Sequence, residues 1–244
     1  MITLLSNGFG DGAMVRWRTL HELAVVAALV EEGDEDLAKR YMDHDAIEQK
    51  NSAVDFDQNH EALGYAAIDA RTRRYIDAKY DEVVERYGRE FRGQYGWASG
   101  YLGKARPTFK DIQAAVGRST MNSYYKLASQ NVHAGTRAAF FRLTTMGRDN
   151  VVLAGRSNAG LLEPGQSTGY TLTQITGSLL GTPSTLDQIV ELSTLIAIRD
   201  AIPVAFYRAS RKLYKDEAEF QRSRAQGKRK PKSLRRKTVS KEQM

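Results

Sequence analysis

Apolar residues recur along most of the chain at the three- and four-residue spacing that is typical of one face of an α-helix. The first such segment runs from Met14 into Val30, and its second half is apolar on all sides, which indicates burial. Gly33 and Asp34 follow, a pair typical of a helix end and of the cap on the next helix. The same periodicity predicts further helices over residues 35–50, 61–87, 108–116, 119–143, 170–180 and 184–222.

Glycine and proline interrupt this helical pattern at three places. The segment GQYGWASGYLGKARP, residues 93–107, predicts a loop held by Trp97, and residues 144–169 predict a long ordered loop or a short hairpin. Pro203 lacks an amide donor and should kink or split the last helix. We therefore predict an all-α protein, an irregular bundle of about six or seven helices with a long Gly-rich loop and a basic C-terminal tail.

The predicted elements divide the chain into a helical domain, residues 1–221, and the tail, residues 222–244. Within the domain, residues 14–143 form the first group of helices, 144–169 the loop, and 170–221 the C-terminal helices. A chain of 244 residues is long enough for one good-sized hydrophobic core. One main domain is therefore expected.

Basic residues are concentrated in the tail. Of the 36 Lys and Arg residues, ten lie between Arg222 and Lys241 with no acidic residue among them, which leaves 26 basic against 29 acidic residues elsewhere. Such a segment repels itself and has little apolar surface to bury, so we expect it to be disordered when free. It could serve only to keep the protein in solution, or it could contact RNA, DNA or another polyanion. The cations we expect to make that contact are Lys228, Arg229, Lys230, Lys232, Arg235, Arg236 and Lys237.

Composition also excludes several classes of chemistry. The chain has no cysteine, which removes disulfides, thiolate zinc sites and cysteine nucleophiles, and is compatible with a cytoplasmic location. The longest apolar run, Leu23 to Val30, is far shorter than the roughly 20 residues that a membrane helix needs. The N-terminus lacks the basic and long apolar regions of a secretory signal. We expect no membrane segment.

Arg18 and Glu22 are the first candidate site residues. They are four residues apart on the first helix, so they share a face, and the residues around them are apolar. A charged pair near a core is costly to desolvate and persists only when it is well bonded. The pair could clamp a neighbouring helix, or it could face a polar cleft and act on a substrate phosphate or a catalytic partner.

The segment YYKLASQNVHAG, residues 124–135, predicts an amphipathic helix whose polar face carries no acidic residue. The polar residues that share this face are Lys126, Ser129, Gln130, His133, Thr136 and Arg137. The face could simply meet water, as most polar helix faces do. Alternatively, its cations, hydroxyl, amide and imidazole form a set suited to a phosphate group, with His133 as the catalytic residue.

Metal and cofactor motifs are weak. His44 and Glu48 are four residues apart, with Asp43 and Asp45 beside them, but nothing fixes a third ligand such as Asp57 or His60. His21 has the position of a core or core-edge residue. The glycines match neither a phosphate-binding loop nor a dinucleotide fingerprint. We expect no metal and no cofactor.

Four segments in a specific order carry a family resemblance. They are RTLHE at 18–22, AKRYMDHDAIEQKN at 38–51, YGREFRGQYGWAS at 87–99 and YYKLASQNVHAG at 124–135. Together they resemble a widespread bacterial family, number 5677 among the domains of unknown function, over most of Met14 to about Leu143. This resemblance bears on the fold and implies no activity.

The chain is also distantly similar to HEPN domains, helical bundles that often act as metal-independent ribonucleases in toxin, abortive-infection and antiphage systems. Their hallmark is an arginine, four to six residues and then a histidine on one helix, commonly completed across a homodimer. The similarity implies that His133 is a general acid or base for attack by the RNA 2′-hydroxyl. Here Lys126 stands at the widest of these spacings, so the arginine is absent unless Arg137 or Arg18 replaces it in space.

Two functional hypotheses follow. The chain could be a HEPN-like endoribonuclease or effector of a defence or toxin system that acts as a homodimer. Alternatively, it could be a non-catalytic helical module whose tail binds nucleic acid, with RNA as the first expectation, and whose polar face docks a protein partner.

Overall fold

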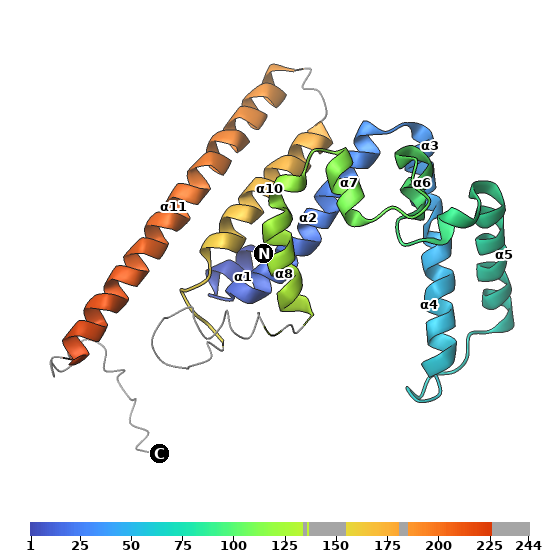
Figure 1. The fold of residues 1–244 in the computed structure, drawn as a ribbon, viewed down its shortest axis with the longest axis horizontal. Coiled ribbons are helices and arrows are strands. Elements are labelled where there is room, and N and C mark those ends of the chain that lie inside the picture. The colour runs from blue at the N-terminus through green and yellow to red at the C-terminus, as the bar shows by residue number, and fades with distance from the viewer. Residues whose placement is uncertain (134–135, 137–154, 181–184, 226–244) are drawn as a thin grey trace, which may run out of the picture.

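The computed structural model describes residues 1–133, 136, 155–180 and 185–225 of the chain (Figure 1). All regular elements in this part are helices, so the all-α prediction is confirmed. They are α1 (Ile2–Ser6), α2 (Gly10–Glu32), α3 (Glu35–Asp43), α4 (Asp45–Asn59), α5 (Ala70–Tyr87), α6 (Ser99–Leu102), α7 (Phe109–Ala115), α8 (Asn122–Val132), α10 (Leu162–Leu180) and α11 (Leu186–Ala225), with short 3₁₀ turns at Arg89–Arg92, Gly96–Ala98 and Ser119–Met121. The described helices outnumber the predicted six or seven because α1 and α6 form where no helix was predicted and because the second predicted helix is divided into α3 and α4.

The long helix α2 is the centre of the fold, and α8 and α10 pack along it (Figure 1). Trp17 on α2 is fully buried, and its indole Nε1 donates a hydrogen bond to Thr171 Oγ1 of α10 at 2.9 Å. Met14 of α2 and Ala128 of α8 are buried beside the Trp17 indole. A buried indole that keeps its hydrogen-bond partner fixes the position of α10 on α2.

The single helix predicted over residues 35–50 is wrong, because the chain forms α3 and α4 with a break at His44. Asp34 caps α3 as predicted, since its carboxylate accepts a hydrogen bond from the Leu37 amide at 2.8 Å. His44 is buried, and its Nε2 donates to the Gly93 carbonyl at 2.9 Å. This bond ties the junction between the two helices to the loop that follows α5.

Helix α5 also begins later than the predicted residue 61. Gly64 has a positive φ of 74°, a conformation outside the helical region that glycine adopts readily. The Asp69 carboxylate then accepts hydrogen bonds from the amides of Arg71 and Thr72 at 2.9 and 3.0 Å and starts the helix. Helices α4 and α5 form a hairpin at the end of the molecule away from α11 (Figure 1).

The Gly-rich segment after α5 is held by Trp97, as predicted. Trp97 is buried against Tyr41, with ring centroids 5.0 Å apart. Arg40 donates from Nε to the Trp97 carbonyl at 2.9 Å and lies over the rings of Tyr87 and Phe91. The following helix α7 begins with the predicted capping box, in which Thr108 and Asp111 each bond to the backbone amide of the other.

Part of the predicted loop over residues 144–169 is wrong, because α10 begins at Leu162. Pro164 lies in the first turn, where its missing amide has no intrahelical partner to lose. Gly165 and Gly169 lie where α11 approaches closely, and a Cβ atom on either would collide with Phe206 or Ile202 of α11. Glycines that favour a loop in the sequence therefore serve helix packing in the fold.

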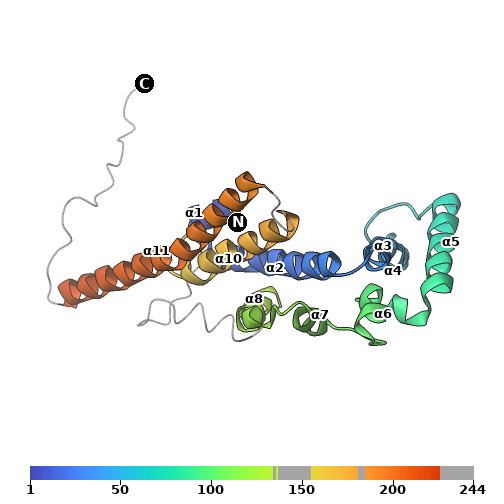
Figure 2. The same cartoon turned by 90° about the horizontal axis from the view of Figure 1, so that it is seen from above.

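Helix α11 continues unbroken through Pro203, so the predicted split does not occur. Ile202 and Phe206, on either side of this proline, both pack on α10. These contacts hold α11 against α10 on both sides of the proline. Figure 2 shows the C-terminal part of α11 extending beyond the other helices.

Candidate functional site

Arg18 and Glu22 form the predicted ion pair on α2, with Arg18 Nη2 3.1 Å from Glu22 Oε1. Tyr125 of α8 joins them: its hydroxyl donates to Glu22 Oε1 at 2.6 Å and accepts from Arg18 Nη2 at 3.2 Å. The guanidinium also lies over the Tyr125 ring, 5.2 Å from its centroid. The side chains of Arg18 and Glu22 are 22% and 31% exposed, so the pair lies at the edge of the core and is reached by solvent. These contacts join α2 to α8.

The electrostatics of this cluster keep its phenols protonated at neutral pH. Burial, followed by the hydrogen bond to Glu22, raises the pKa of Tyr125. Burial, with the nearby Tyr125 and Glu22, raises the pKa of Tyr95 to about 12. Burial acts to lower the pKa of Arg18, but the hydrogen bond to Tyr125 and the charge of Glu22 outweigh it, so the net shift is upward. The cluster therefore offers one permanent cation and hydroxyl donors, and no phenolate nucleophile.

The buried Nε of Arg18 has no hydrogen-bond partner within the described structure. Because an unpaired buried donor costs free energy, this N–H is available to a ligand oxygen or an ordered water. Nη2 of the guanidinium serves both Tyr125 and Glu22. The cluster therefore offers its Nε–H to a small anionic or carbonyl-bearing group at its edge.

The polar face of α8 is only partly exposed. Lys126 and His133 are exposed, whereas Ser129 and Gln130 are half-buried. Ser129 Oγ donates to the carbonyl of Tyr125 within its own helix at 2.8 Å, and Gln130 Oε1 is buried without a hydrogen-bond partner. Of these four residues, only the lysine and the histidine are presented freely to a large ligand.

The structure does not bring His133 to the Arg18–Glu22 pair. Tyr125, at the start of α8, contacts that pair, whereas Asn131, near the end of α8, lines a small pocket with Gly10 at the start of α2. His133 follows α8 as its C-cap, eight residues after Tyr125, or roughly 12 Å along the helix axis. The three residues proposed as one catalytic group therefore lie in two separate places.

Most of the remaining residues that were predicted to bind phosphate or nucleic acid are not described by the structure. Arg137 and the tail cations Lys228, Arg229, Lys230, Lys232, Arg235, Arg236 and Lys237 lie outside the described residues. Thr136 is exposed. The contribution of Arg137 and the tail to binding stays a prediction from sequence.

His21 is a core residue with a polar partner, as its position on α2 indicates. It is fully buried, stacks on Trp17 with centroids 5.3 Å apart, and its Nε2 lies 3.0 Å from the side-chain amide of Gln113 on α7. Burial, and to a lesser degree the charge of Arg118, lowers its pKa to about 4. His21 is therefore neutral at physiological pH, and no substrate reaches it.

No group of three or more His, Asp or Glu side chains is placed to hold a metal ion in the described ranges. Of the weak metal motif in the sequence, His44 uses Nε2 for the Gly93 carbonyl and has Glu48 3.7 Å from Nδ1. The same residues contain no helix with the length and apolar character required to cross a membrane.

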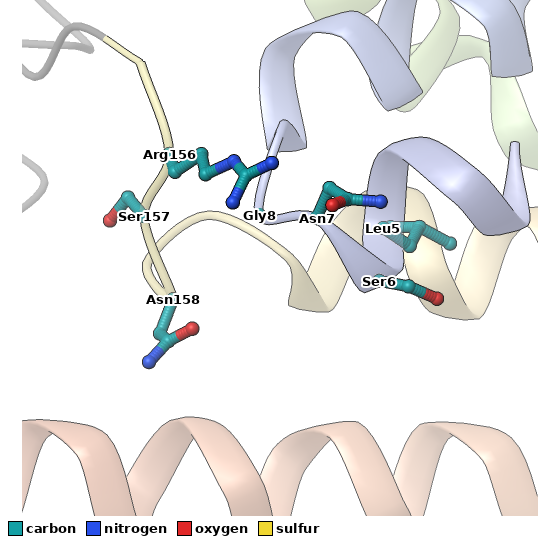
Figure 3. A pocket seen from close by; sticks show the side chains of 7 residues that line it. All are labelled: Leu5, Ser6, Asn7, Gly8, Arg156, Ser157 and Asn158. Carbon is teal, nitrogen blue, oxygen red and sulfur yellow. The ribbon is translucent and has the colours of Figure 1, made fainter.

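A polar pocket of about 280 Å³ lies between the α1–α2 connection and residues 156–158 (Figure 3). Its lining residues are Leu5, Ser6, Asn7, Gly8, Arg156, Ser157 and Asn158. The Ser157 amide donates to the Gly8 carbonyl at 2.9 Å and brings the two segments together. Sequence reasoning could not find this pocket, because it depends on contacts between segments about 150 residues apart. One guanidinium with hydroxyls and amides suits a small polar or anionic ligand.

The hydroxyl of Tyr125 offers a test of this geometry. We expect Tyr125→Phe to lower the free energy of unfolding by about 1 kcal/mol, because Glu22 and Arg18 each lose a hydrogen-bond partner at a half-buried position. Tyr101→Phe is the matched control, since the Tyr101 hydroxyl is exposed and its contact with the Glu32 carbonyl is 3.5 Å long. Urea denaturation of both variants measures the difference, and equal stabilities would show that the Tyr125 bridge contributes nothing.

Comparison with known proteins identifies a family and no characterised relative. No curated protein and no solved structure matches the chain significantly. The model of a family of unknown function, DUF5677, matches residues 1–150, which is more than half of the chain and includes α1 to α8 and the Arg18–Glu22–Tyr125 cluster. The chain therefore belongs to the DUF5677 family.

Proposed function

We propose that the chain is a non-catalytic helical module that binds nucleic acid, RNA in the first place, through a basic C-terminal arm, which we define as residues 208–241. The arm holds 14 Lys and Arg residues against three acidic ones. Attraction to phosphate requires cations and no fixed pocket geometry. This concentration of charge is the observation that carries the proposal.

The described part of the arm supports the proposal. Arg208, Arg211, Lys212 and Lys215 are exposed in the C-terminal half of α11. Figure 2 shows the C-terminal part of this helix extending beyond the other helices. Lys212 and Lys215 are paired with Asp216 and Glu219 within the helix. Arg208 has no acidic partner among the residues placed by the structure, so its charge is available to a polyanion.

A binding role fits the candidate site better than a ribonuclease role. Phosphodiester cleavage by the proposed mechanism needs an imidazole and a cation that act on one phosphate. His133 lies at one end of α8, whereas Arg18 contacts Tyr125 at the other. Without Arg18, a HEPN-like ribonuclease would have Lys126 and Arg137 as the predicted cations for phosphate binding beside His133. The experiment below separates the two functions.

We expect the full-length protein to bind a fluorescein-labelled single-stranded RNA with an affinity that falls linearly on a logarithmic salt scale. Replacing the seven tail cations, Lys228 to Lys237, with glutamine should weaken binding at least tenfold. It should also flatten the salt slope by up to about 5, since each phosphate contact to a single strand contributes roughly 0.7. Fluorescence anisotropy from about 50 to 300 mM KCl measures both quantities.

The control is a variant in which residues 228–237 are shuffled, which keeps the charge and should keep the affinity. Unchanged binding after glutamine replacement, or no binding by the wild type, would contradict the proposal. The same RNA is analysed on a denaturing gel in the presence of a chelator. Cleavage by the wild type that His133→Ala abolishes would instead establish the ribonuclease.

A further inference from the structure

Helix α11 has two apolar faces, and the residues that the structure describes cover only one of them. Ile202 and Phe206 on the inner face pack against Gly169 and Gly165 of α10, and Arg199 lies 6.0 Å from the Tyr170 ring centroid. On the opposite face, large apolar side chains stand in solvent: Leu186 is 74% exposed and Tyr207 54%. None of the side chains described on α11 is fully buried. A helix whose second apolar face is open along its length is typical of an association surface.

The exposed face follows the alternating three- and four-residue spacing of a coiled-coil seam. We call this set the outer stripe: Leu186, Val190, Ser193, Ala197, Asp200, Val204, Tyr207, Arg211, Tyr214 and Ala218, all of them exposed. Ile189 and Ile196, also exposed, widen the stripe in its first half. The spacing continues for more than four heptads, which is long enough to specify a helix pair.

We propose that the outer stripe binds the outer stripe of a second copy of this chain, with the two α11 helices antiparallel. This inference goes beyond nucleic-acid binding and does not depend on it. The charged residues of the outer stripe indicate both the partner and its orientation. Asp200 and Arg211 are the only charged residues of the outer stripe, one of each sign, eleven positions apart.

An antiparallel pair with its two-fold axis between Val204 and Tyr207 matches these charges. The seam residues alternate between the a and d positions of the heptad, and in an antiparallel pair an a residue faces a d residue of the other helix. With the axis placed here, position i faces position 411 − i of the second copy. The facing pairs are then Val204 with Tyr207, Asp200 with Arg211, Ala197 with Tyr214, and Ser193 with Ala218. By symmetry each pair occurs twice, so both charges of both copies are matched.

Other arrangements leave the charges unmatched. A parallel pair in register places Asp200 against Asp200 and Arg211 against Arg211, which is repulsive. Shifting the antiparallel pair by one heptad places Asp200 against Val204 or Ala218 and desolvates it without a partner. Of these arrangements, only the antiparallel pair in this register places each charged residue of the outer stripe opposite one of the other sign.

The groups needed for this contact are available in the described chain. Asp200 holds Arg199 at 2.8 Å, but its carboxylate is 63% exposed and has further acceptor positions. Arg211 lies 5.9 Å from the Tyr207 ring centroid and has no acidic partner in the part of the chain that the structure places. The 40-residue helix is roughly 60 Å long, so antiparallel pairing would set the two basic arms at opposite ends of the dimer.

Charge reversal tests both the partner and the register. Sedimentation velocity of the full chain between about 1 and 100 µM should show a monomer–dimer equilibrium. Asp200→Arg alone and Arg211→Asp alone should each raise the dimer Kd at least tenfold, because each places like charges opposite one another. The double variant should restore dimerisation to within a few-fold of the wild type. Circular dichroism and thermal unfolding of each variant confirm that the fold is kept.

Three results would overturn the proposal. The wild type could remain monomeric at the highest concentration. The single variants could dimerise as well as the wild type, which would place the interface elsewhere. The double variant could fail to recover, which would rule out this register. Binding of the monomer to anionic vesicles, lost in Val204→Asp, would assign the outer stripe to a membrane surface instead.

Discussion

Lowering the pH from 7 to 4 is expected to reduce the free energy of unfolding by about 2 to 3 kcal/mol through His21 alone. The side chain is fully buried between Trp17 and Tyr125, and burial, with a smaller contribution from Arg118, lowers its pKa to about 4. In the unfolded chain the pKa of a histidine is near 6.5. As the pH falls, the unfolded state therefore binds the proton first. The stabilisation is fully present above about pH 6.5 and is lost between pH 6.5 and 4.

Urea denaturation at several pH values measures this dependence, and two variants assign it. In the double variant His21→Leu, Gln113→Leu, both hydrogen-bond partners become apolar, so no amide is left unpaired in the core. In that variant, the free energy of unfolding should decrease less between pH 6.5 and 4 than in the wild type, whatever its value at pH 7. His133→Gln is the control, since the His133 imidazole is exposed, and it should keep the decrease. If the double variant lost stability on acidification as steeply as the wild type, other groups would account for it.

Local signals in the sequence predicted the local features of the fold. The Asp34 cap, the capping box of Thr108 and Asp111, and the long helix that contains Arg18 and Glu22 were all correct. Each depends on residues within four positions of one another, so a single stretch of sequence contains the whole interaction. The same reasoning explains why the ion pair between Arg18 and Glu22 was predicted and is present.

The errors occurred where distant contacts override local preference. Glycines and Pro164 made residues 162–169 look like a loop, but contact with α11 gives those residues a helical role. His44 lies inside a helical pattern, yet its bond to Gly93 marks a break between α3 and α4. The sequence contains no signal for a role of Tyr125, because only the fold brings its hydroxyl within 2.6 Å of Glu22, 103 positions away. The position of His133 relative to Arg18 likewise depends on the direction of α8, which the sequence does not contain.

Substitution of Gly165 by alanine is expected to lower the free energy of unfolding by roughly 1 to 3 kcal/mol, as overpacking of a tight contact does. The new methyl group would overlap with the ring of Phe206 on α11. An aromatic ring moves as one rigid block, and this one is half-buried between two helices, so α10 and α11 would have to separate. Intrinsic helix propensity acts in the opposite direction, since alanine is better than glycine by about 1 kcal/mol. A net loss in stability therefore means that the packing cost exceeds the gain in helix propensity, and it underestimates the packing cost by about 1 kcal/mol.

Gly177 provides the matched control for this substitution. It lies in the same helix, and nothing is within 4 Å of the position that its Cβ would occupy, so Gly177→Ala should keep or raise stability by up to about 1 kcal/mol. Phe206→Leu should recover part of the loss in Gly165→Ala, because the smaller side chain leaves room for the methyl group. The double-mutant cycle in urea denaturation then gives a coupling free energy between positions 165 and 206. Equal stabilities for the two alanine variants would mean that Phe206 of α11 does not pack closely against Gly165 of α10, and that this part of the inner face of α11 is open.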